Sequence, residues 1–171
     1  MIETERLYLR EMTDEDFGAL RQVLGDPEIM CHYPYCFDEE RIRNWIHRNR
    51  ERYRVFGFGL WAVCRKDTGE MIGDCGLTMQ IVDGQILPEI GYHIRGDQQR
   101  QGFAKEAARA VRDWTFEHTP FRVVYSYMKA ENIPSIRTAL SYGCTAAGEF
   151  RDDEGEITRV YALTRKDWEE I

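Results

Sequence analysis

The stretch from Arg95 to Ala108, RGDQQRQGFAKEAA, has the residue types and spacing of an anion-binding turn. The alternating run PEIGYHI before it predicts a strand, and the helical spacing of Phe103, Ala107 and Val111 after it predicts a helix. Gly102 then stands at the helix start, where unpaired N–H groups and the helix dipole face outward. This arrangement favours a phosphate or pyrophosphate, and Gly102 would let that ligand approach the backbone closely.

A glycine at a helix start also commonly just separates two elements. The turn alone is therefore compatible with an anion site and with a simple connection. Other nucleotide-binding loops do not fit, because the chain has no GxGxxG and no GxxxxGK followed by Ser or Thr. Three basic side chains would add positive charge for phosphates, with solvated surface as the alternative for each of them: Arg95, Arg100 and Lys105.

The length and composition are those of one globular domain spanning residues 1–171. Hydrophobic residues make up 43% of the chain, charged residues make up 31%, and the formal net charge is −7. Such an acidic chain is a poor match for nucleic acid or an anionic membrane. No run reaches the roughly 20 apolar residues of a membrane span. The N-terminus lacks a signal-peptide core, and the five cysteines lack framework spacing, which together predict reduced thiols and a cytoplasmic location.

No metal site is expected from the sequence. Cys31, His32 and Cys36 lie close together, but a second pair of ligands at suitable spacing is missing.

The pattern along the chain predicts an α+β fold. Alternating and apolar runs predict strands at 4–10, 57–64, 71–81, 85–95, 122–128, 144–151 and 156–164. Capping residues and helical periodicity predict helices at 13–25, 38–53, 103–118 and 132–142. The strand–helix–strand unit over 85–128 predicts one parallel pair, whereas hairpin turns join most other neighbours. The expected sheet is therefore mixed, mostly antiparallel and flanked by helices.

This order of elements and the turn together resemble the GNAT superfamily of N-acetyltransferases. The family's pyrophosphate loop has Gln or Arg, two residues, Gly, one residue, and Gly or Ala, which Gln99, Gly102 and Ala104 fill here. The chain looks most like the RimJ/RimL-like branch, the ribosomal-protein N-terminal acetyltransferases. The stretches that carry this resemblance are TERLYLREMTDEDF, WIHRNRERY, TGEMIGDCGL, PEIGYHI and ENIPSIRTALSYGC. It implies the GNAT fold and acetyl-CoA as co-substrate.

The resemblance also implies a set of acetyl-CoA contacts. In GNAT proteins the strand before the loop separates from the next strand, and its free backbone groups hold the pantetheine arm. Tyr92, His93 and Ile94 would supply these groups, one N–H polarising the thioester carbonyl. The other implied contacts come from the loop and from the starts of two helices: Arg95, Arg100, Gln101, Gly102, Phe103, Ala104, Lys105, Asn132 and Ser135. Asn132 is equally suited to be an ordinary N-cap.

Glu89, in PEIGY, matches a position where family members often carry a carboxylate that acts as a base. Burial in a cleft would raise its pKa, which suits proton transfer near neutral pH. The alternative is a carboxylate paired with an arginine such as Arg65 or Arg122. The family's proton-donating tyrosine is replaced by Ala139 here. The proton donor is therefore unassigned: Tyr142, one helical turn further, is a candidate or else a core residue, Ser141 and water are the alternatives, and thiolate release without a dedicated acid is a further one.

The predicted acceptor walls are aromatic, although aromatic side chains also fill cores: Tyr33, Tyr35, Trp45, Trp61 and Tyr127. The first expected acceptor is a peptide or protein N-terminus. A small cationic amine, such as a polyamine or an aminoglycoside, is the alternative. A non-catalytic acyl-CoA-binding module is a further alternative, because Ala139 replaces the tyrosine. The sequence fits a monomer and a homodimer alike.

Overall fold

The computed structural model describes all residues, 1–171, and is built around one eight-stranded sheet. The strand order is β1-β2-β3-β4-β5-β6-β8-β7, and only β5 and β6 run parallel. The strands are β1 (Ile2–Glu3), β2 (Leu7–Arg10), β3 (Leu60–Arg65), β4 (Met71–Val82), β5 (Gln85–Ile94), β6 (Val123–Lys129), β7 (Thr145–Arg151) and β8 (Ile157–Thr164). This mixed, mostly antiparallel sheet confirms the predicted fold class.

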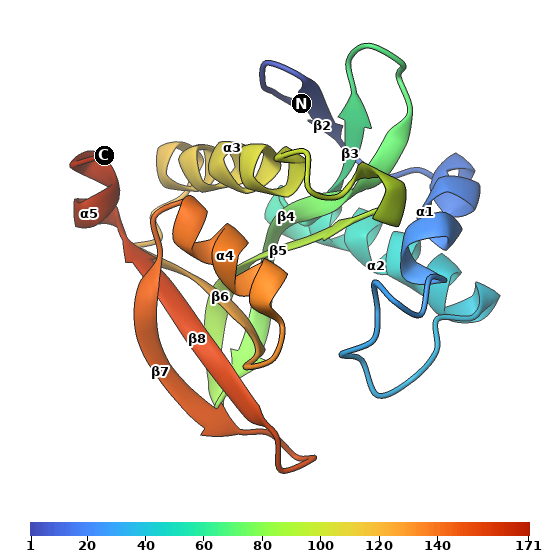
Figure 1. The fold of residues 1–171 in the computed structure, drawn as a ribbon. Coiled ribbons are helices and arrows are strands. Elements are labelled where there is room, and N and C mark those ends of the chain that lie inside the picture. Colours follow the sequence, from blue (N-terminus) through green and yellow to red (C-terminus); the bar gives the residue numbers. More distant parts are fainter.

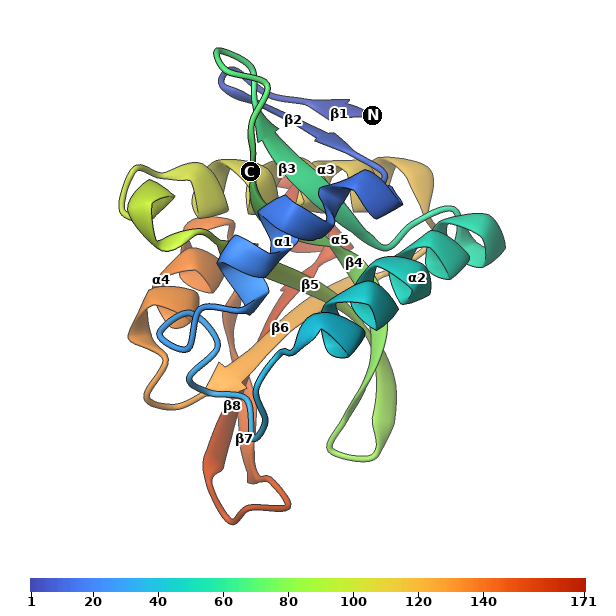
Figure 2. The same cartoon turned by 90° about the vertical axis from the view of Figure 1, so that its right-hand side faces the viewer.

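Helices cover both faces of the sheet (Figures 1 and 2). On one face lie α1 (Phe17–Leu24) and α2 (Glu39–Phe56), and on the other lies α3 (Phe103–His118), with α4 (Ile133–Ser141) beside it. The short elements are the 3₁₀ turns η1 (Asp14–Asp16) and η2 (Gly96–Gln98) and the terminal α5 (Arg165–Glu169). None of the helices combines the length and the apolar composition that a bilayer crossing requires.

The β4–β5 hairpin sets the register on which the site depends. Asp83 and Gly84 both have positive φ, 48° and 75°, as a two-residue type I′ turn requires. The turn fixes three successive cross-strand pairs that share one face of the sheet: Thr78 with Glu89, Gly76 with Gly91, and Asp74 with His93. This face is the one covered by α2, because Trp45 of α2 bonds to Asp74.

Beyond one paired position, Glu89 with Tyr125, β5 and β6 separate. The other edge of β5 is paired with β4, and there Arg95 N–H donates to Ile72 O over 2.8 Å. Because antiparallel ladders alternate, the peptide groups of His93 face β4, and those of Tyr92 and Ile94 face the gap. The separation that the family resemblance implied is therefore present.

Helix α2 is anchored on the sheet by one buried stripe: Ile42, Ile46, Asn49 and Tyr53. Trp45 and Arg52 lie seven residues apart beside this stripe, so they point the same way about two turns apart. Since Trp45 contacts Asp74 and the Tyr53 hydroxyl bonds to Leu60 O, α2 runs along the sheet from Asp74 toward the start of β3. Arg52 thus reaches the opposite end of the covered face.

Candidate active site

Glu89 stands in the middle of β5, at the last position before the sheet opens. Its carboxylate folds over Gly91, because a β-carbon on that glycine would lie 3.0 Å from Glu89 Oε2. The side chain is therefore directed along the strand toward His93, which shares its face. The missing side chain at Gly91 is what gives the carboxylate this room.

No protein group makes a hydrogen bond or ion pair with the Glu89 carboxylate. The arginines considered as partners lie elsewhere, since Arg65 Nε donates to Asp67 Oδ1 over 2.9 Å and Arg122 is exposed. Burial raises the pKa of Glu89 to about 7, although the positive charges of His93 and Arg52 oppose the shift. A carboxyl group with that pKa exchanges protons near neutrality, as a general base must.

Asp74 organises a buried network that the sequence analysis missed. Its Oδ1 lies 2.8 Å from His93 Nδ1, and its Oδ2 accepts a hydrogen bond from Trp45 Nε1 over 2.9 Å. On the other side of the ring, His93 Nε2 lies 3.2 Å from the hydroxyl of Tyr33. Burial lowers the pKa of His93. The charge and the hydrogen bond of Asp74 raise this pKa, and the net shift is upward. The available signal was one aspartate inside the apolar strand MIGDCGL.

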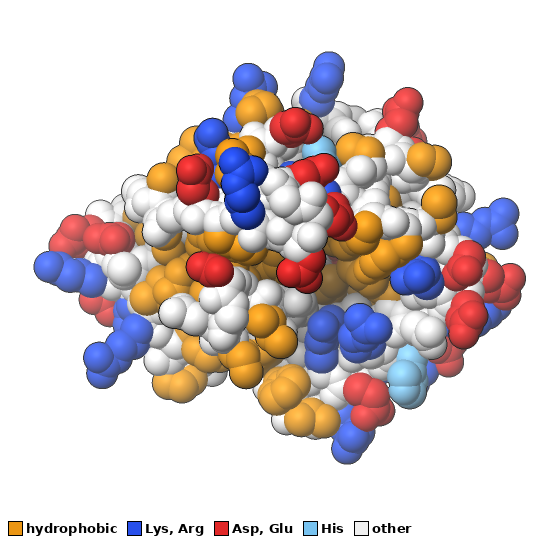
Figure 3. Space-filling model, turned by 90° about the horizontal axis from the view of Figure 1, so that it is seen from below, with side chains coloured by type: hydrophobic (Ala, Val, Ile, Leu, Met, Phe, Trp, Pro, Cys, Tyr) orange, Lys and Arg blue, Asp and Glu red, His pale blue; other side chains and the backbone are white.

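Four of the five predicted wall residues lie around this face. The rings of Tyr33 and Tyr35 are 6.0 Å apart, and that of Trp45 is 5.7 Å from His93. After burial, the negative charge of Glu89 is the next cause that raises the pKa values of Tyr33 and Tyr127. Seen from below, the molecule is furrowed, with hydrophobic side chains along the furrow and charged side chains of both signs on its rims (Figure 3).

Trp61, the fifth predicted wall residue, lies on the wrong face. It pairs with Cys75, so strand alternation turns it away from the Asp74 face. Its ring lies 4.9 Å from that of Trp114 on α3, and the residue is only 7% exposed. The prediction is therefore corrected: Trp61 is a core residue under α3.

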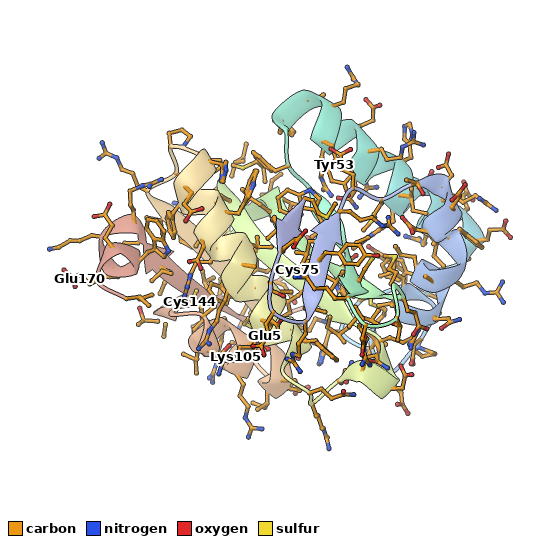
Figure 4. The ribbon with its side chains drawn as sticks, turned by 90° about the horizontal axis from the view of Figure 1, so that it is seen from above. Glu5, Tyr53, Cys75, Lys105, Cys144 and Glu170 are labelled. Atoms are coloured by element: carbon orange, nitrogen blue, oxygen red, sulfur yellow. The ribbon has the colours of Figure 1, made fainter.

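The loop before α3 presents six consecutive backbone N–H groups with no protein acceptor, from Arg100 to Lys105. The first helical bond begins only at Glu106 N–H, which donates to Gly102 O over 3.0 Å. Gly102 adopts φ 84°, a conformation that costs glycine nothing sterically. Figure 4 shows Lys105 at this end of α3. Donors and helix dipole together suit an anion such as a pyrophosphate.

Side chains around the loop divide into free and engaged groups. Arg100 and Lys105 are exposed and form no ion pair, so their charges remain available. The Phe103 side chain is buried, so this residue offers only its free backbone N–H group to a ligand. Arg95 corrects the prediction, because its guanidinium already binds Glu70 Oε1 at 2.7 Å and Asp97 Oδ1 at 2.6 Å. Two carboxylates therefore pair with Arg95, so its charge is not free in the way that the prediction assumed.

Replacing Gly102 by alanine is expected to weaken acetyl-CoA binding about tenfold or more. The left-handed conformation costs a non-glycine residue about 1–2 kcal/mol, and the new β-carbon would lie 3.3 Å from Arg6 Nη2. Titration calorimetry with acetyl-CoA measures the change. Gly155→Ala is the matched control, because Gly155 has φ 80° in a hairpin turn with nothing within 4 Å. Equal affinities for both variants would contradict the assignment of the loop.

The start of α4 lies beside the gap between β5 and β6. Asn132 caps α4, its Oδ1 accepting from Ser135 N–H over 3.3 Å, and the Tyr92 hydroxyl donates to Ser135 O over 2.7 Å. Ile94 O accepts from Gln99 Nε2 over 2.8 Å. The backbone donors left toward the gap are those of Tyr92 and Ile94, whereas His93 contributes its side chain to the other face.

Tyr142 is not available as a proton donor. It is 0% exposed, and its hydroxyl lies 2.6 Å from Ser126 Oγ, which in turn donates to Ile90 O. Burial raises the pKa of Tyr142 well above 10, which further disfavours proton loss. The predicted catalytic role is corrected to a structural one that locks α4 onto β6. Ala139 is buried as well, at 0% exposure.

The variant Tyr142→Phe is expected to destabilise the fold while leaving acetyl transfer intact. Losing one buried hydrogen bond costs about 1 kcal/mol, and no reacting group is removed. Thermal unfolding together with steady-state thiol release tests both parts. A large fall in kcat at unchanged stability would return Tyr142 to the mechanism.

These features fit a class of protein, the acyl-CoA-dependent N-acyltransferases: an opened sheet, a loop of free N–H groups and a carboxylate at the point of opening. A model of the acetyltransferase (GNAT) domain, of the RimJ/RimL type, matches residues 6–145. The chain belongs to this GNAT acetyltransferase family and is an N-acetyltransferase. Enzymes of the family use acetyl-CoA.

Several known proteins are similar along most of the chain. The protein YkkB of Bacillus subtilis (strain 168) is 35% identical over 141 residues, which cover 82% of each chain. The N-acetyltransferase p20 of Bacillus licheniformis is 31% identical over 167 residues, covering 94% of this chain and 93% of p20. A solved acetyltransferase from Agrobacterium tumefaciens str. C58 has a TM-score of 0.82 at 28% identity, covering 96% and 94% of the two chains.

Proposed function

We propose that the protein transfers the acetyl group of acetyl-CoA to a primary amine by direct attack, with Glu89 as the general base. The observation that carries this proposal is an inward carboxylate with no hydrogen-bond partner and a pKa of about 7, at the position where the sheet opens. The amine must be uncharged to attack, and Glu89 Oε accepts its proton directly or through one water.

The donor side is supported by the free backbone groups described above. Bound acetyl-CoA supplies an activated acyl group, and the six N–H groups from Arg100 to Lys105 suit its pyrophosphate. The Tyr92 N–H faces the gap beside Glu89 and is suited to stabilise negative charge on the acyl oxygen. Arg100 and Lys105 add free positive charge at the same end. Asn132 and Ser135 border the gap from α4.

The acceptor side is bounded by Tyr33, Tyr35, Trp45 and Tyr127, held by the Asp74–His93 network. Two fold neighbours illustrate the acceptors that this fold serves. One is RimL, a ribosomal L7/L12 alpha-N-protein acetyltransferase, with a TM-score of 0.72 at 18% identity. The other is a spermidine N-acetyltransferase from Vibrio cholerae, with a TM-score of 0.76 at 16% identity. We take an α-amine, as on a peptide N-terminus, as the first acceptor class.

A thiol-release assay with acetyl-CoA against N-terminal peptides, polyamines, aminoglycosides and amino acids tests this function. Acceptor-dependent release of free CoA is expected. Tight acetyl-CoA binding with no release for any acceptor would favour a non-catalytic acyl-CoA-binding module, the alternative that Ala139 at the tyrosine position leaves open.

A further inference from the structure

Arg52 of α2 is an exception among the arginines of this protein. Six arginine side chains are buried or half-buried: Arg10, Arg52, Arg65, Arg95, Arg112 and Arg165. Five of them bind a carboxylate or several backbone carbonyls. Arg52 makes one hydrogen bond, in which Nη1 donates to Asn49 Oδ1 over 3.0 Å. Four of its five N–H donors therefore have no protein acceptor.

Glu89 is the matching exception among the carboxylates. The other buried or half-buried acids each have a hydrogen-bond partner: Asp16, Asp26, Asp74, Glu106, Asp113 and Asp152. Glu89 alone has none. No fully buried side-chain polar atom lacks a partner, so the free atoms of Arg52 and Glu89 are open to solvent and available to a ligand.

Arg52 and the backbone of Glu89 lie at the same end of the face that α2 covers, and the Glu89 carboxylate turns from there toward the middle of the face. A β-carbon on Gly59 would lie 3.2 Å from Arg52 Cβ, so Arg52 rests on the backbone just before β3. Gly59 O accepts a hydrogen bond from Leu77 N–H, and the next residue along β4, Thr78, pairs with Glu89. Arg52 and Glu89 are thus separated by β4, and no ion pair joins them.

The charges of the two groups nevertheless act on each other. Burial and the neighbouring Arg48 lower the pKa of Arg52, while the charge of Glu89 raises it. Asn49 fixes the guanidinium, because the Oδ1 that accepts from Arg52 also accepts from Leu60 N–H, and Asn49 is 1% exposed. Arg52 is therefore held in place before any ligand arrives, which limits the entropy lost on binding.

We propose that the acceptor is a free α-amino acid, whose carboxylate binds Arg52 while its amine is presented to Glu89. This inference rests on the proposed acetyl transfer to an α-amine with Glu89 as base, and it replaces the peptide N-terminus by a free amino acid as the acceptor. A carboxylate accepts two parallel N–H bonds from one guanidinium, and Arg52 has the donors to make them. The aromatic side chains of Tyr33, Tyr35, Trp45 and Tyr127 border the same face and would contact the amino acid's side chain.

This arrangement disfavours the other two acceptor classes. A polyamine brings a second ammonium group toward Arg48 and Arg52, where like charges repel. A peptide N-terminus has an amide in place of the carboxylate, so the guanidinium would keep unsatisfied donors. Specificity then comes from a group that rejects acceptors lacking its partner.

The experiment first measures thiol release with each of the twenty amino acids. For the best of them, kcat/KM is compared with that of its α-carboxamide and of its decarboxylated amine. The free acid is expected to exceed both by about 10- to 100-fold. In Arg52→Gln the ratio of acid to amide is expected to fall to near one, and comparing ratios between variants cancels the differences in amine basicity.

Two further variants make this result decisive. Arg54→Gln removes an exposed arginine on the same helix, paired to Glu51, and is expected to leave the ratio unchanged. Arg52→Lys keeps the charge and is expected to retain part of the preference. An unchanged affinity for acetyl-CoA, measured by titration calorimetry, shows that each variant is folded. The inference is overturned if amides or polyamines are preferred, or if Arg52→Gln keeps the wild-type ratio; absence of any acceptor would instead overturn the proposed function.

Discussion

Replacing Glu89 by glutamine is expected to lower kcat for acetyl transfer about 10²- to 10⁴-fold, the usual contribution of a general base. Glutamine keeps the size and the position over Gly91 but cannot accept the proton. The substitution leaves the six free N–H groups from Arg100 to Lys105 unchanged, so the affinity for acetyl-CoA is expected to stay constant. Steady-state thiol release and titration calorimetry measure the two quantities separately.

The same residue sets the expected pH dependence. The base works only when deprotonated, so kcat/KM in the wild-type protein should rise with pH and level off above the pKa of Glu89, about 7. Because this folded-state pKa lies above the unfolded value, Glu89 stabilises the fold at low pH, and this contribution is lost as the pH rises through 7. Glu89→Gln should therefore gain thermal stability relative to wild type at pH 8 and not at pH 5.

Glu117→Gln is a matched control, since Glu117 is exposed on α3. It should change neither kcat nor the pH profile. Wild-type turnover in Glu89→Gln would remove this residue from the mechanism. If Glu89→Gln lowers turnover but kcat/KM still rises with pH as in the wild type, Glu89 contributes through its packing or charge and not by accepting a proton.

Replacing Asp74 by alanine is expected to give the largest loss of stability among single changes near the site. Asp74 is 1% exposed and binds both His93 and Trp45, so its removal leaves two buried donors without an acceptor. Breaking a buried pair in this way costs about 3 kcal/mol, which corresponds to a Tm lower by roughly 6–12 °C for a chain of this size. Thermal unfolding followed by circular dichroism measures it.

Asp74→Asn separates charge from packing. The amide retains an oxygen for Trp45 but loses the negative charge beside His93. Burial then lowers the pKa of His93 without the opposing charge of Asp74, so this pKa should fall, as a proton NMR titration would detect. Asp67→Asn, which changes an exposed carboxylate paired with Arg65, should leave Tm unchanged. An unshifted His93 titration would contradict the network as described.

The amino-acid sequence by itself determined the framework of this protein and predicted its donor side. Strand alternation, helix caps and the turn signals are local, so the order of elements and the β4–β5 hairpin followed from them. The signal of the loop with Gln99, Gly102 and Ala104 is also local, because its hydrogen-bond donors are consecutive backbone N–H groups. Glu89 was predicted for a similar reason, from its place within PEIGY on the strand that enters this loop.

The acceptor side depended on tertiary structure. Alternation along the strand tells which residues share a face of the sheet, but not whether α2 or α3 covers that face. The contact of Trp61 with Trp114 places it under α3. Tyr142 and Arg95 looked available because the sequence does not reveal partners on other elements; Ser126 bonds to Tyr142, and Glu70 pairs with Arg95. Asp74 and Arg52 gained meaning only by contact, the first through His93, 19 residues away, and the second by lacking an acid. Local chemistry can be read from neighbouring residues, whereas the pairing of buried charges is decided by packing between elements far apart in the chain.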